Sequence, residues 1–361
     1  MFSASLADLP TCPILHCKSR GIFRNMQYLC GKNLKKMKIL GLGNALVDVL
    51  LRLENDEVLS KIGICKGAME MIDQERMIAI RTAWQGLERT MAPGGSVCNT
   101  MRAISMLGGE SGYLGKIGDD EVGAYYEEAL RKAGVVPYFV KTSGISGSCT
   151  VLISPDGERT MCTFLGPAPT IMPEEIQESV LSQYQCIYIE GYLLVNEALV
   201  RSTMVKAKRL GLKVALDLSN FNIVNAFKPL LDELIPAYVD ILFSNESEAE
   251  AFTGRPAREA APVLANMVEV ALVTLGKEGS LIASGGSLFE IPAIGEGRVD
   301  TTGAGDNFAA GCLYGLSKGV SLDRAGRIGS LLAGEVVKVV GPQIPETEWE
   351  QIKLKVGDLL G

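Results

Sequence analysis

Short runs of apolar residues alternate with helix-like segments from residue 37 onward. Five of these runs are continuously apolar, as in strands that are buried on both faces; they span residues 38–42, 185–190, 213–218, 239–243 and 270–275. Continuous strands joined by helices indicate a parallel sheet covered by helices on both sides. The pattern therefore predicts an α/β domain with a doubly wound, mainly parallel sheet.

The connecting segments carry the periodicity and end signals of helices. Apolar residues three or four apart precede Gly108-Gly109, which is a helix stop signal. Residues 121–133 lie between the potential cap Asp120 and Gly134, and residues 196–210 end at Gly211. We expect helices in all three segments.

Two stretches depart from this alternation. Residues 48–75 lack a long helix, whereas 136–165 predict successive strands, with a turn at Pro155-Asp156-Gly157. Two such insertions can pair as one small sheet, a lid over the active face of the domain. Alternatively, each forms an independent hairpin at a sheet edge.

Composition and charge exclude several classes of protein. The 361 residues include 42 acidic and 35 basic ones, and a net charge of −7 disfavours binding to nucleic acid. The sequence contains no run of 18 apolar residues, which a membrane-spanning helix would need. The single histidine, His16, argues against sites built on imidazole. Nine scattered cysteines without a C-x-x-C pair are typical of reduced thiols, so we expect a cytoplasmic protein.

Residues 1–36 differ from the rest of the chain. They hold six basic residues and one acid, and they lack both periodicity and the apolar core of a signal peptide. The apolar pattern begins abruptly at Met37. We interpret 1–36 as a disordered or mis-started leader, with a mitochondrial targeting peptide as the alternative, and 37–361 as the folded domain.

The strongest chemical signal is the string Asp300-Thr301-Thr302-Gly303-Ala304-Gly305-Asp306, which leads into a predicted helix at 307–318. Small residues before a helix leave backbone N–H groups open to an anion and to charge on a transferred group. A helix start also favours an ionised Asp306, which can act as a general base. The alternative is an ordinary aspartate cap behind a glycine turn.

Two further motifs suggest ligand contacts. Gly94-Gly95 lets backbone approach a ligand closely, and Asn99, one helical turn later, can bond to hydroxyl groups; a helix start capped by Ser96 is an equally good explanation. Asn245 and Glu248 share one face of a helix after a buried strand, where they can hold a hydrated Mg²⁺. In isolation this pair reads as a solvated acidic face, but its place after a strand favours the ligand role.

These motifs together resemble the ribokinase-like (PfkB) family of carbohydrate and nucleoside kinases. The D-T-T-G-A-G-D string is similar to the family's C-terminal signature, and residues 93–99 with 107–120 are similar to its first signature. Asn245–Glu248 matches its N-x-x-E motif, and 273–279 looks like its nucleotide-pocket strand and turn. The four elements stand in family order and cover 37–361.

The resemblance implies a ribokinase-like fold, ATP as phosphoryl donor, Mg²⁺ and a monovalent cation such as K⁺. Because no P-loop string occurs, ATP phosphates would lie against Gly303, Ala304, Gly305 and Mg²⁺. Asp306 would be the catalytic base. The other implied nucleotide and metal contacts are Asn245, Glu248, Thr274, Gly276, Gly279, Thr302 and Gly341. Gly341-Pro342 resembles a loop near the end of the family's chains. Pro342 departs there from the Ala or Cys that is usual after this glycine in the adenosine-kinase-like branch.

The acceptor is expected near the first strand. Asp48 can accept two protons from a vicinal diol, and the spacing from Asn44 to Asp48 is similar to the adenosine-kinase-like branch. Gly94, Gly95 and Asn99 complete the expected acceptor contacts. Arg159 on the second β segment can meet a substrate anion or phosphate, or it is an ordinary surface arginine.

We therefore predict an ATP-dependent kinase that phosphorylates a primary hydroxyl, with a nucleoside, adenosine first, slightly preferred. The alternative acceptor is a monosaccharide such as ribose, fructose or a keto-deoxy sugar acid. A non-catalytic sugar or nucleotide sensor is the alternative of another class, although a sensor need not keep Asp306. The exposed edges of the lid also allow two copies of the chain to pair as a homodimer.

Overall fold

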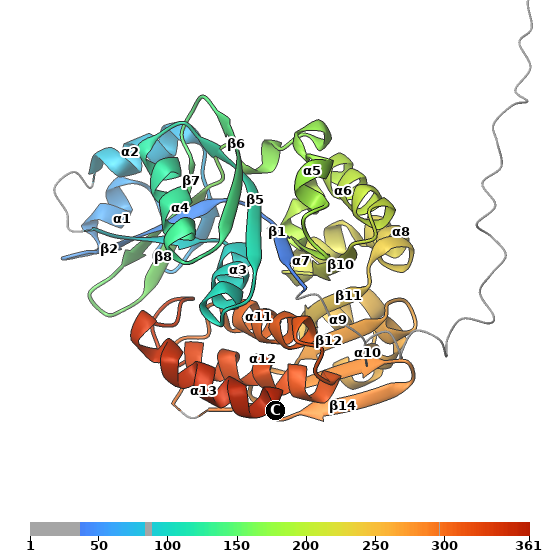
Figure 1. The fold of residues 1–361 in the computed structure, drawn as a ribbon. Helices are drawn as coiled ribbons and strands as arrows, with labels where there is room; N and C mark the ends of the chain where they lie inside the picture. The colour runs from blue at the N-terminus through green and yellow to red at the C-terminus, as the bar shows by residue number, and fades with distance from the viewer. Residues whose placement is uncertain (1–36, 84–88, 296) are drawn as a thin grey trace, which may run out of the picture. The chain divides into compact units, whose positions relative to one another are not determined.

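The protein is described here from a computed structural model, which covers residues 37–83, 89–295 and 297–361. The predicted leader lies outside these ranges. The described residues contain two sheets and the helices that cover them (Figure 1).

Nine strands of the described chain form the large sheet, in the order β14-β13-β12-β11-β10-β9-β1-β5-β6. In chain order they are β1 (Ile39–Leu42), β5 (Ser111–Gly118), β6 (Val136–Thr142), β9 (Cys186–Glu190), β10 (Lys213–Asp217), β11 (Ile241–Asn245), β12 (Val270–Thr274), β13 (Ser280–Ser284) and β14 (Ser287–Ile291). The strands from β6 to β12 are parallel, whereas β13 and β14 are antiparallel additions at one edge. The five continuous apolar runs are β1, β9, β10, β11 and β12, which confirms the prediction of a mainly parallel sheet.

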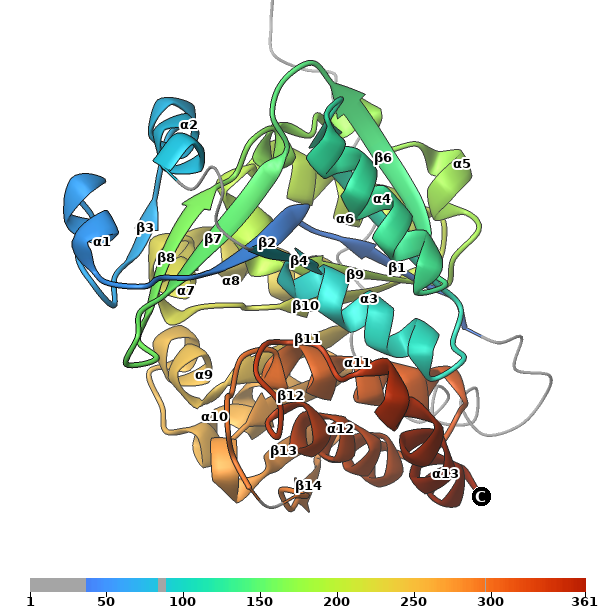
Figure 2. The same cartoon turned by 90° about the vertical axis from the view of Figure 1, so that its left-hand side faces the viewer.

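Alternate residues of each strand enter different cores on the two faces of the large sheet. Cys186 and Tyr188 of β9 pack with helices α3, α11, α12 and α13, and Ile187 and Ile189 pack with α6, α8, α9 and α10. These helices are α3 (Ser96–Met106), α6 (Glu197–Arg209), α8 (Lys228–Tyr238), α9 (Glu246–Thr253), α10 (Ala257–Ala265), α11 (Ala304–Ser317), α12 (Leu322–Val336) and α13 (Trp349–Leu360). Both faces are therefore covered, as predicted for a doubly wound sheet (Figure 2).

The predicted helices form with the expected end signals. Helix α4 (Glu121–Lys132) is capped by Asp120, whose carboxylate accepts from the Gly123 amide, and Asn196 caps α6 in the same way. Gly41 of β1 allows α3 to pack closely, because a Cβ there would lie 2.3 Å from Val97. Helix α11 begins at Ala304, three residues earlier than expected, so Asp306 lies in its first turn.

The second sheet has five strands in the described chain, in the order β3-β8-β7-β2-β4. They are β2 (Leu46–Arg52), β3 (Met69–Met71), β4 (Arg89–Gly94), β7 (Gly147–Ile153) and β8 (Arg159–Phe164). Segments far apart in sequence thus share one sheet, because β2 pairs with β7 and β3 pairs with β8. We call these five strands the lid sheet.

The expected boundaries of the lid need a correction. Strand β6 (Val136–Thr142) pairs in parallel with β5 and belongs to the large sheet, although the sequence grouped it with 136–165. Strand β4 joins the lid sheet, although the pattern did not predict it as a strand. One face of the sheet is buried against α1 (Glu57–Lys61) and α2 (Gln74–Ala83), where Val49 and Leu152 meet Leu59 and Met77.

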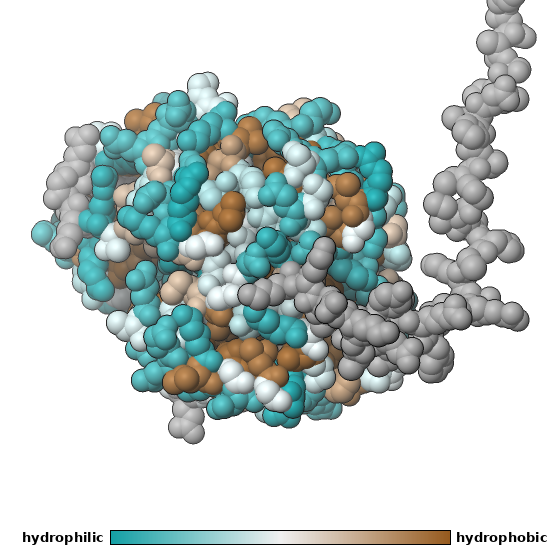
Figure 3. All heavy atoms as spheres, in the orientation of Figure 1, coloured by the Kyte–Doolittle hydropathy of each residue, from teal (hydrophilic) through white to brown (hydrophobic). Residues whose placement is uncertain are grey.

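On the face drawn in Figure 3, hydrophilic residues are interspersed with small hydrophobic patches, as is usual for globular domains. No described helix is long and apolar enough to cross a membrane. The six described cysteines are free thiols, and Cys98, Cys162, Cys186 and Cys312 are buried.

Candidate active site

A cavity of about 430 Å³ opens between the lid sheet and the carboxyl ends of the parallel strands. Asp217 ends β10, Asn245 ends β11 and Thr274 ends β12, and all three line it. The first turns of α3 and α11 and the lid residue Asp48 close the other sides. This is the edge at which α/β sheets bind ligands.

Helix α11 presents its N-terminus to the cavity. Its N-cap is Gly303, with φ +76°, and no described side chain caps the helix. A Cβ on Gly303 would lie 2.6 Å from Pro342, so only glycine fits there. The Ala304 amide donates to the Thr301 carbonyl, while within the described chain the amides of Gly305 and Asp306 make no hydrogen bond. Of the amides expected to bind an anion, that of Ala304 is thus engaged, whereas that of Gly303, like those of Gly305 and Asp306, makes no hydrogen bond within the described chain.

The Asp306 carboxylate is held by two side chains of α3. Ser96 Oγ donates to Oδ1 at 2.7 Å, and Asn99 Nδ2 donates to Oδ2 at 2.9 Å. Burial raises the pKa of Asp306 to about 6, and the bonds from Ser96 and Asn99 oppose this rise. The helix start does not hold the pKa low, as the sequence suggested, yet at neutral pH most of the carboxylate is still ionised.

This arrangement bears on two sequence interpretations of α3. Asn99, which was expected to bond to the acceptor, lines the cavity, and its Nδ2 donates to Asp306. Ser96 was the alternative cap of α3, but the N-cap is Gly95 and no side chain caps this helix. Both residues therefore position the candidate base.

Asp48 faces the cavity from strand β2 of the lid sheet. Gly94 lies beside it on β4, and a Cβ at residue 94 would come within 2.5 Å of the carboxylate. Burial raises the pKa of Asp48 to about 7, and the negative charge of Asp306 adds to this rise. Gly94 therefore makes room for the carboxylate rather than for a ligand, whereas Gly95 does line the cavity.

Asn44 does not lie where the sequence predicted. It is buried, and its backbone N–H and Nδ2 both donate to Oε1 of Glu190, at 2.9 and 2.6 Å. Glu190 ends β9 and was not predicted as a site residue. Since the Asn44 amide is committed to this carboxylate and lies outside the cavity lining, it acts as support for the segment that leads to Asp48.

Asn245 and Glu248 form a reciprocal capping box at the start of α9. Glu248 N–H donates to Asn245 Oδ1 at 2.9 Å, and the Glu248 carboxylate accepts from Asn245 N–H and Nδ2. Only 3% of Glu248 is exposed, so the solvated acidic face is excluded. Burial raises the pKa of Glu248 to about 7, and the Asp217 charge adds to the rise.

Arg159 is also bound differently from the expectation. Its Nη1 lies 3.0 Å from Oδ2 of Asp300, and it does not line the cavity. The Asp300 carboxylate also accepts from the Gly341 amide and from the Thr302 amide and hydroxyl. Despite the cost of burial, these bonds hold the pKa of Asp300 at about 2. Arg159 thus ties the lid sheet to the turn before α11.

The remaining predicted nucleotide residues divide into two groups. Thr274 and Thr302 line the cavity with Asn245, whereas Gly276, Gly279 and Gly341 do not. The residues that sequence reasoning missed are Asp217, Ser219 and Tyr192, which line the cavity, and Gln343, which contacts Asn99. Asp217 had a usable signal, because it stands at the carboxyl end of a predicted strand.

Comparisons with known proteins agree with this geometry. Residues 57–349 match the family described as "pfkB family carbohydrate kinase". The adenosine kinase of Schizophyllum commune is 27% identical over 347 residues, which are 88% of this chain and 98% of the relative. The crystal structure of adenosine kinase from Sinorhizobium meliloti is 33% identical, with a TM-score of 0.76, and the match covers 88% of this chain and 99% of the other.

A second solved structure carries a different description. The probable sugar kinase from Rhizobium etli CFN 42 is 31% identical, with a TM-score of 0.78, and the match covers 90% of this chain and 99% of the other. Both structures match almost all of the folded domain. The chain therefore belongs to the pfkB family of carbohydrate kinases and is an ATP-dependent phosphotransferase that acts on a nucleoside or a sugar.

Proposed function

We propose that this kinase transfers the γ-phosphate of ATP to the primary hydroxyl of a nucleoside, with adenosine preferred, and that Asp306 is the catalytic base. The observation that carries this proposal is the position of Asp306. Its carboxylate lies in the first turn of α11, next to the unbonded Gly305 and Asp306 amides. Phosphoryl transfer requires such an arrangement, in which one group orients the hydroxyl while amides stabilise the transferred charge.

The charge of the cavity indicates how a nucleotide is accommodated. Four carboxyl groups line it, from Asp48, Asp217, Glu248 and Asp306, and no lysine or arginine is among the described lining residues. A triphosphate needs compensating cations in such a site. The Arg159 side chain is committed to Asp300, so a divalent cation is the simplest source of positive charge.

Asn245 and Glu248 suit a hydrated Mg²⁺ rather than a directly chelated one. Both Glu248 oxygens already accept from Asn245, so a metal-bound water is the group that can reach them without breaking the cap. Among the described residues, no cluster of three or more acidic, cysteine or histidine side chains is arranged to chelate a metal. Bound with nucleotide, Mg²⁺ would neutralise phosphate charge.

The lid residues around Asp48, where the acceptor is expected, favour a nucleoside as the acceptor. Asp48 pairs across the lid sheet with Ala92 and Cys149, and Cys149 pairs with Thr163. Since paired residues share a face, and residues two apart share it too, the half-buried face around Asp48 also carries the apolar side chains of Leu46, Leu50, Val151 and Met161. One carboxylate in an apolar face suits a ribose diol attached to a flat base.

A free monosaccharide makes different demands. It presents hydroxyl groups on every side, each of which needs a polar partner when it is buried. By the same alternation the lid face also carries Thr163 and Arg159, but Arg159 is committed to Asp300, so the face provides few such partners. The probable sugar kinase among the solved structures still makes ribose, fructose and keto-deoxy sugar acids necessary comparisons.

The deciding experiment is a panel assay of ADP release with nucleosides and monosaccharides. We expect turnover with ribonucleosides, highest with adenosine, and little with free sugars. A thermal-shift screen with and without Mg-ATP gives an independent readout, because a true acceptor raises the melting temperature. Turnover only with monosaccharides would refute the nucleoside proposal, and ligand binding without ADP release would favour a sensor.

Two further proposals concern the lid and the cation. A homodimer through the open edges of β3 and β4 remains a prediction, since both strands end the lid sheet. The monovalent cation near Gly341 also remains a prediction. Size-exclusion chromatography and an assay with K⁺ replaced by a large organic cation test them separately.

A further inference from the structure

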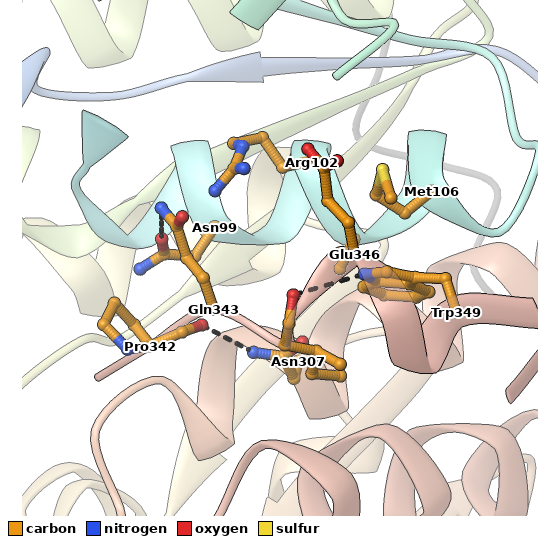
Figure 4. Close-up of a pocket in the computed structure, with 10 residues that line it drawn as sticks. Asn99, Arg102, Met106, Asn307, Pro342, Gln343, Glu346 and Trp349 are labelled. Atoms are coloured by element: carbon orange, nitrogen blue, oxygen red, sulfur yellow. Dashed lines mark hydrogen bonds between the residues drawn. The ribbon is translucent and has the colours of Figure 1, made fainter. Parts of the chain in front are cut away.

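The segment between α12 and α13 contacts three parts of the site through consecutive residues. The Gly341 amide donates to Asp300 Oδ2 at 2.8 Å, and the Pro342 carbonyl accepts from Asn307 Nδ2 at 3.2 Å. Gln343 Nε2 donates to Asn99 Oδ1 at 3.5 Å and to the Pro93 carbonyl. Figure 4 shows Gln343 turned toward Asn99 along the side of α3.

The Pro93 carbonyl fixes the orientation of the Gln343 side-chain amide. A backbone carbonyl only accepts, so the Pro93 carbonyl requires the NH₂ group of Gln343 on its side. The second hydrogen of that NH₂ group then points to Asn99 Oδ1. The two ends of an amide are almost the same size, and this contact favours the orientation that the Asp306 carboxylate also requires, with the Asn99 NH₂ group toward Asp306.

We propose that Gln343 is a positioning residue for Asp306, because it keeps the Asn99 amide turned with its NH₂ group toward the candidate base. The proposal rests on Asp306 being the base of the proposed function. With the opposite orientation, Asn99 would direct its carbonyl oxygen at the carboxylate. The base would then lose a donor and gain a repulsive neighbour.

The surroundings of Asp306 make this donor important. The charged or titratable groups that face it are Asp48 from β2, Glu190 from β9, Asp217 from β10, Tyr188 and Tyr192 from the β9 region and Cys98 from α3. None of these groups is a cation. Ser96 and Asn99 are the side chains that favour the ionised form of Asp306.

The sharpest test replaces Gln343 by glutamate, which has the same shape but no hydrogen to donate. Gln343→Glu should weaken the bond from Asn99 to Asp306, because a second carboxylate then competes for the Asn99 NH₂ group. Arg102 lines a small pocket with Asn99 and Gln343 (Figure 4) and is the cation nearest to the new charge. We expect the acidic limb of the kcat profile to move upward by about 1 pH unit. We also expect kcat at pH 7 to fall about tenfold, with the KM for ATP unchanged.

Two further variants distinguish a positioning role of Gln343 from a packing role. Gln343→Met removes the donor without adding a charge, so it should move the acidic limb in the same direction by a smaller amount. Glu346→Gln is the matched control, since Glu346 lines a small pocket together with Gln343 and Asn99, is exposed, and forms no hydrogen bond with Asn99. Its pH profile should equal that of the unmodified enzyme.

A double-mutant comparison completes the test. In an Asn99→Ala background, Gln343→Met should move the acidic limb no further, because the residue through which it acts is gone and no charge is added. The inference is overturned if both Gln343 variants fold with unchanged melting temperatures and unshifted profiles, or if the shift persists in the Asn99→Ala background. Near-native turnover of Asp306→Asn would instead refute the base itself, and with it the proposed mechanism.

Discussion

The two sides of the cavity are built in different ways. On the α11 side, polar side chains are bonded to one another, so Asp306 is held by Ser96 and Asn99, and Asp300 by backbone amides and Arg159. On the lid side, Asp48 makes no hydrogen bond within the described chain and stands among half-buried apolar residues. The first side is preorganised for one reaction, and the second offers a surface on which acceptors can differ.

The largest expected effect is a loss of turnover when Asp306, on the preorganised α11 side, is replaced. Asp306→Asn keeps the size of the side chain but removes the base, so turnover should fall by about 10²–10⁴. Binding of ATP and acceptor should remain nearly unchanged in calorimetric titrations. Asp358→Asn, on the exposed end of α13, serves as the control. Comparable turnover in the two variants would exclude Asp306 as the base.

The next effect concerns the lid side. Asp48→Ala should weaken acceptor binding by about 10–100-fold, because two hydroxyl groups lose a charged acceptor. ATP affinity should not change. Glu54→Ala, an exposed acid just beyond β2, should leave both affinities as they are. A loss of ATP affinity in Asp48→Ala would mean that the two sides are assigned in reverse.

A smaller effect follows from the raised pKa of Asp48. With a pKa of about 7, the carboxyl is largely protonated at pH 6 and ionised at pH 8. Acceptor affinity, titrated without nucleotide, should therefore increase as the pH rises through 7. In Asp48→Asn this dependence should disappear. A pH dependence that survives in Asp48→Asn would assign it to another group.

The smallest effect is on stability. A buried carboxyl whose folded pKa exceeds its unfolded value binds its proton more tightly in the folded state, so stability declines as the pH rises toward the folded pKa. Asp48→Asn should therefore raise the melting temperature at pH 8, by about 2–4 °C. At pH 5.5 part of the difference should remain, and the two proteins should melt together only below about pH 4, the unfolded pKa of an aspartate. Equal melting temperatures at pH 8 would show that Asp48 is not desolvated.

The comparison also explains what the sequence could predict. The parallel strands and α11 follow from local patterns, because continuous apolar runs and a glycine turn are visible within a few residues. Asp306 could be proposed as the base for the same reason, since its string is contiguous. The contacts of Arg159 with Asp300 and of Gln343 with Asn99 join residues 141 and 244 positions apart, and no local pattern contains them.

The lid also shows that local sequence patterns do not reveal the partners of a strand or a side chain. Strand β6 was grouped with the second β segment because it directly precedes β7 and β8 in the sequence, but its pairing with β5 places it in the large sheet. Asn44 and Asn99 were assigned to the acceptor by residue type. In the structure each amide is used by a neighbouring carboxylate, Glu190 or Asp306. The residue types correctly indicated polar groups near the site. Only the hydrogen-bond partners in the folded structure determine which of these groups stay free to contact a ligand.

The acidic cavity has a consequence for how ligand binding is measured. Near neutral pH the carboxyls of Asp48 and Glu248 are only partly ionised. A cation or a hydroxyl pair that prefers the ionised form will expel hydrogen ions into the buffer. The heat of binding should therefore vary with the ionisation enthalpy of that buffer, and the slope would count the hydrogen ions released with each ligand.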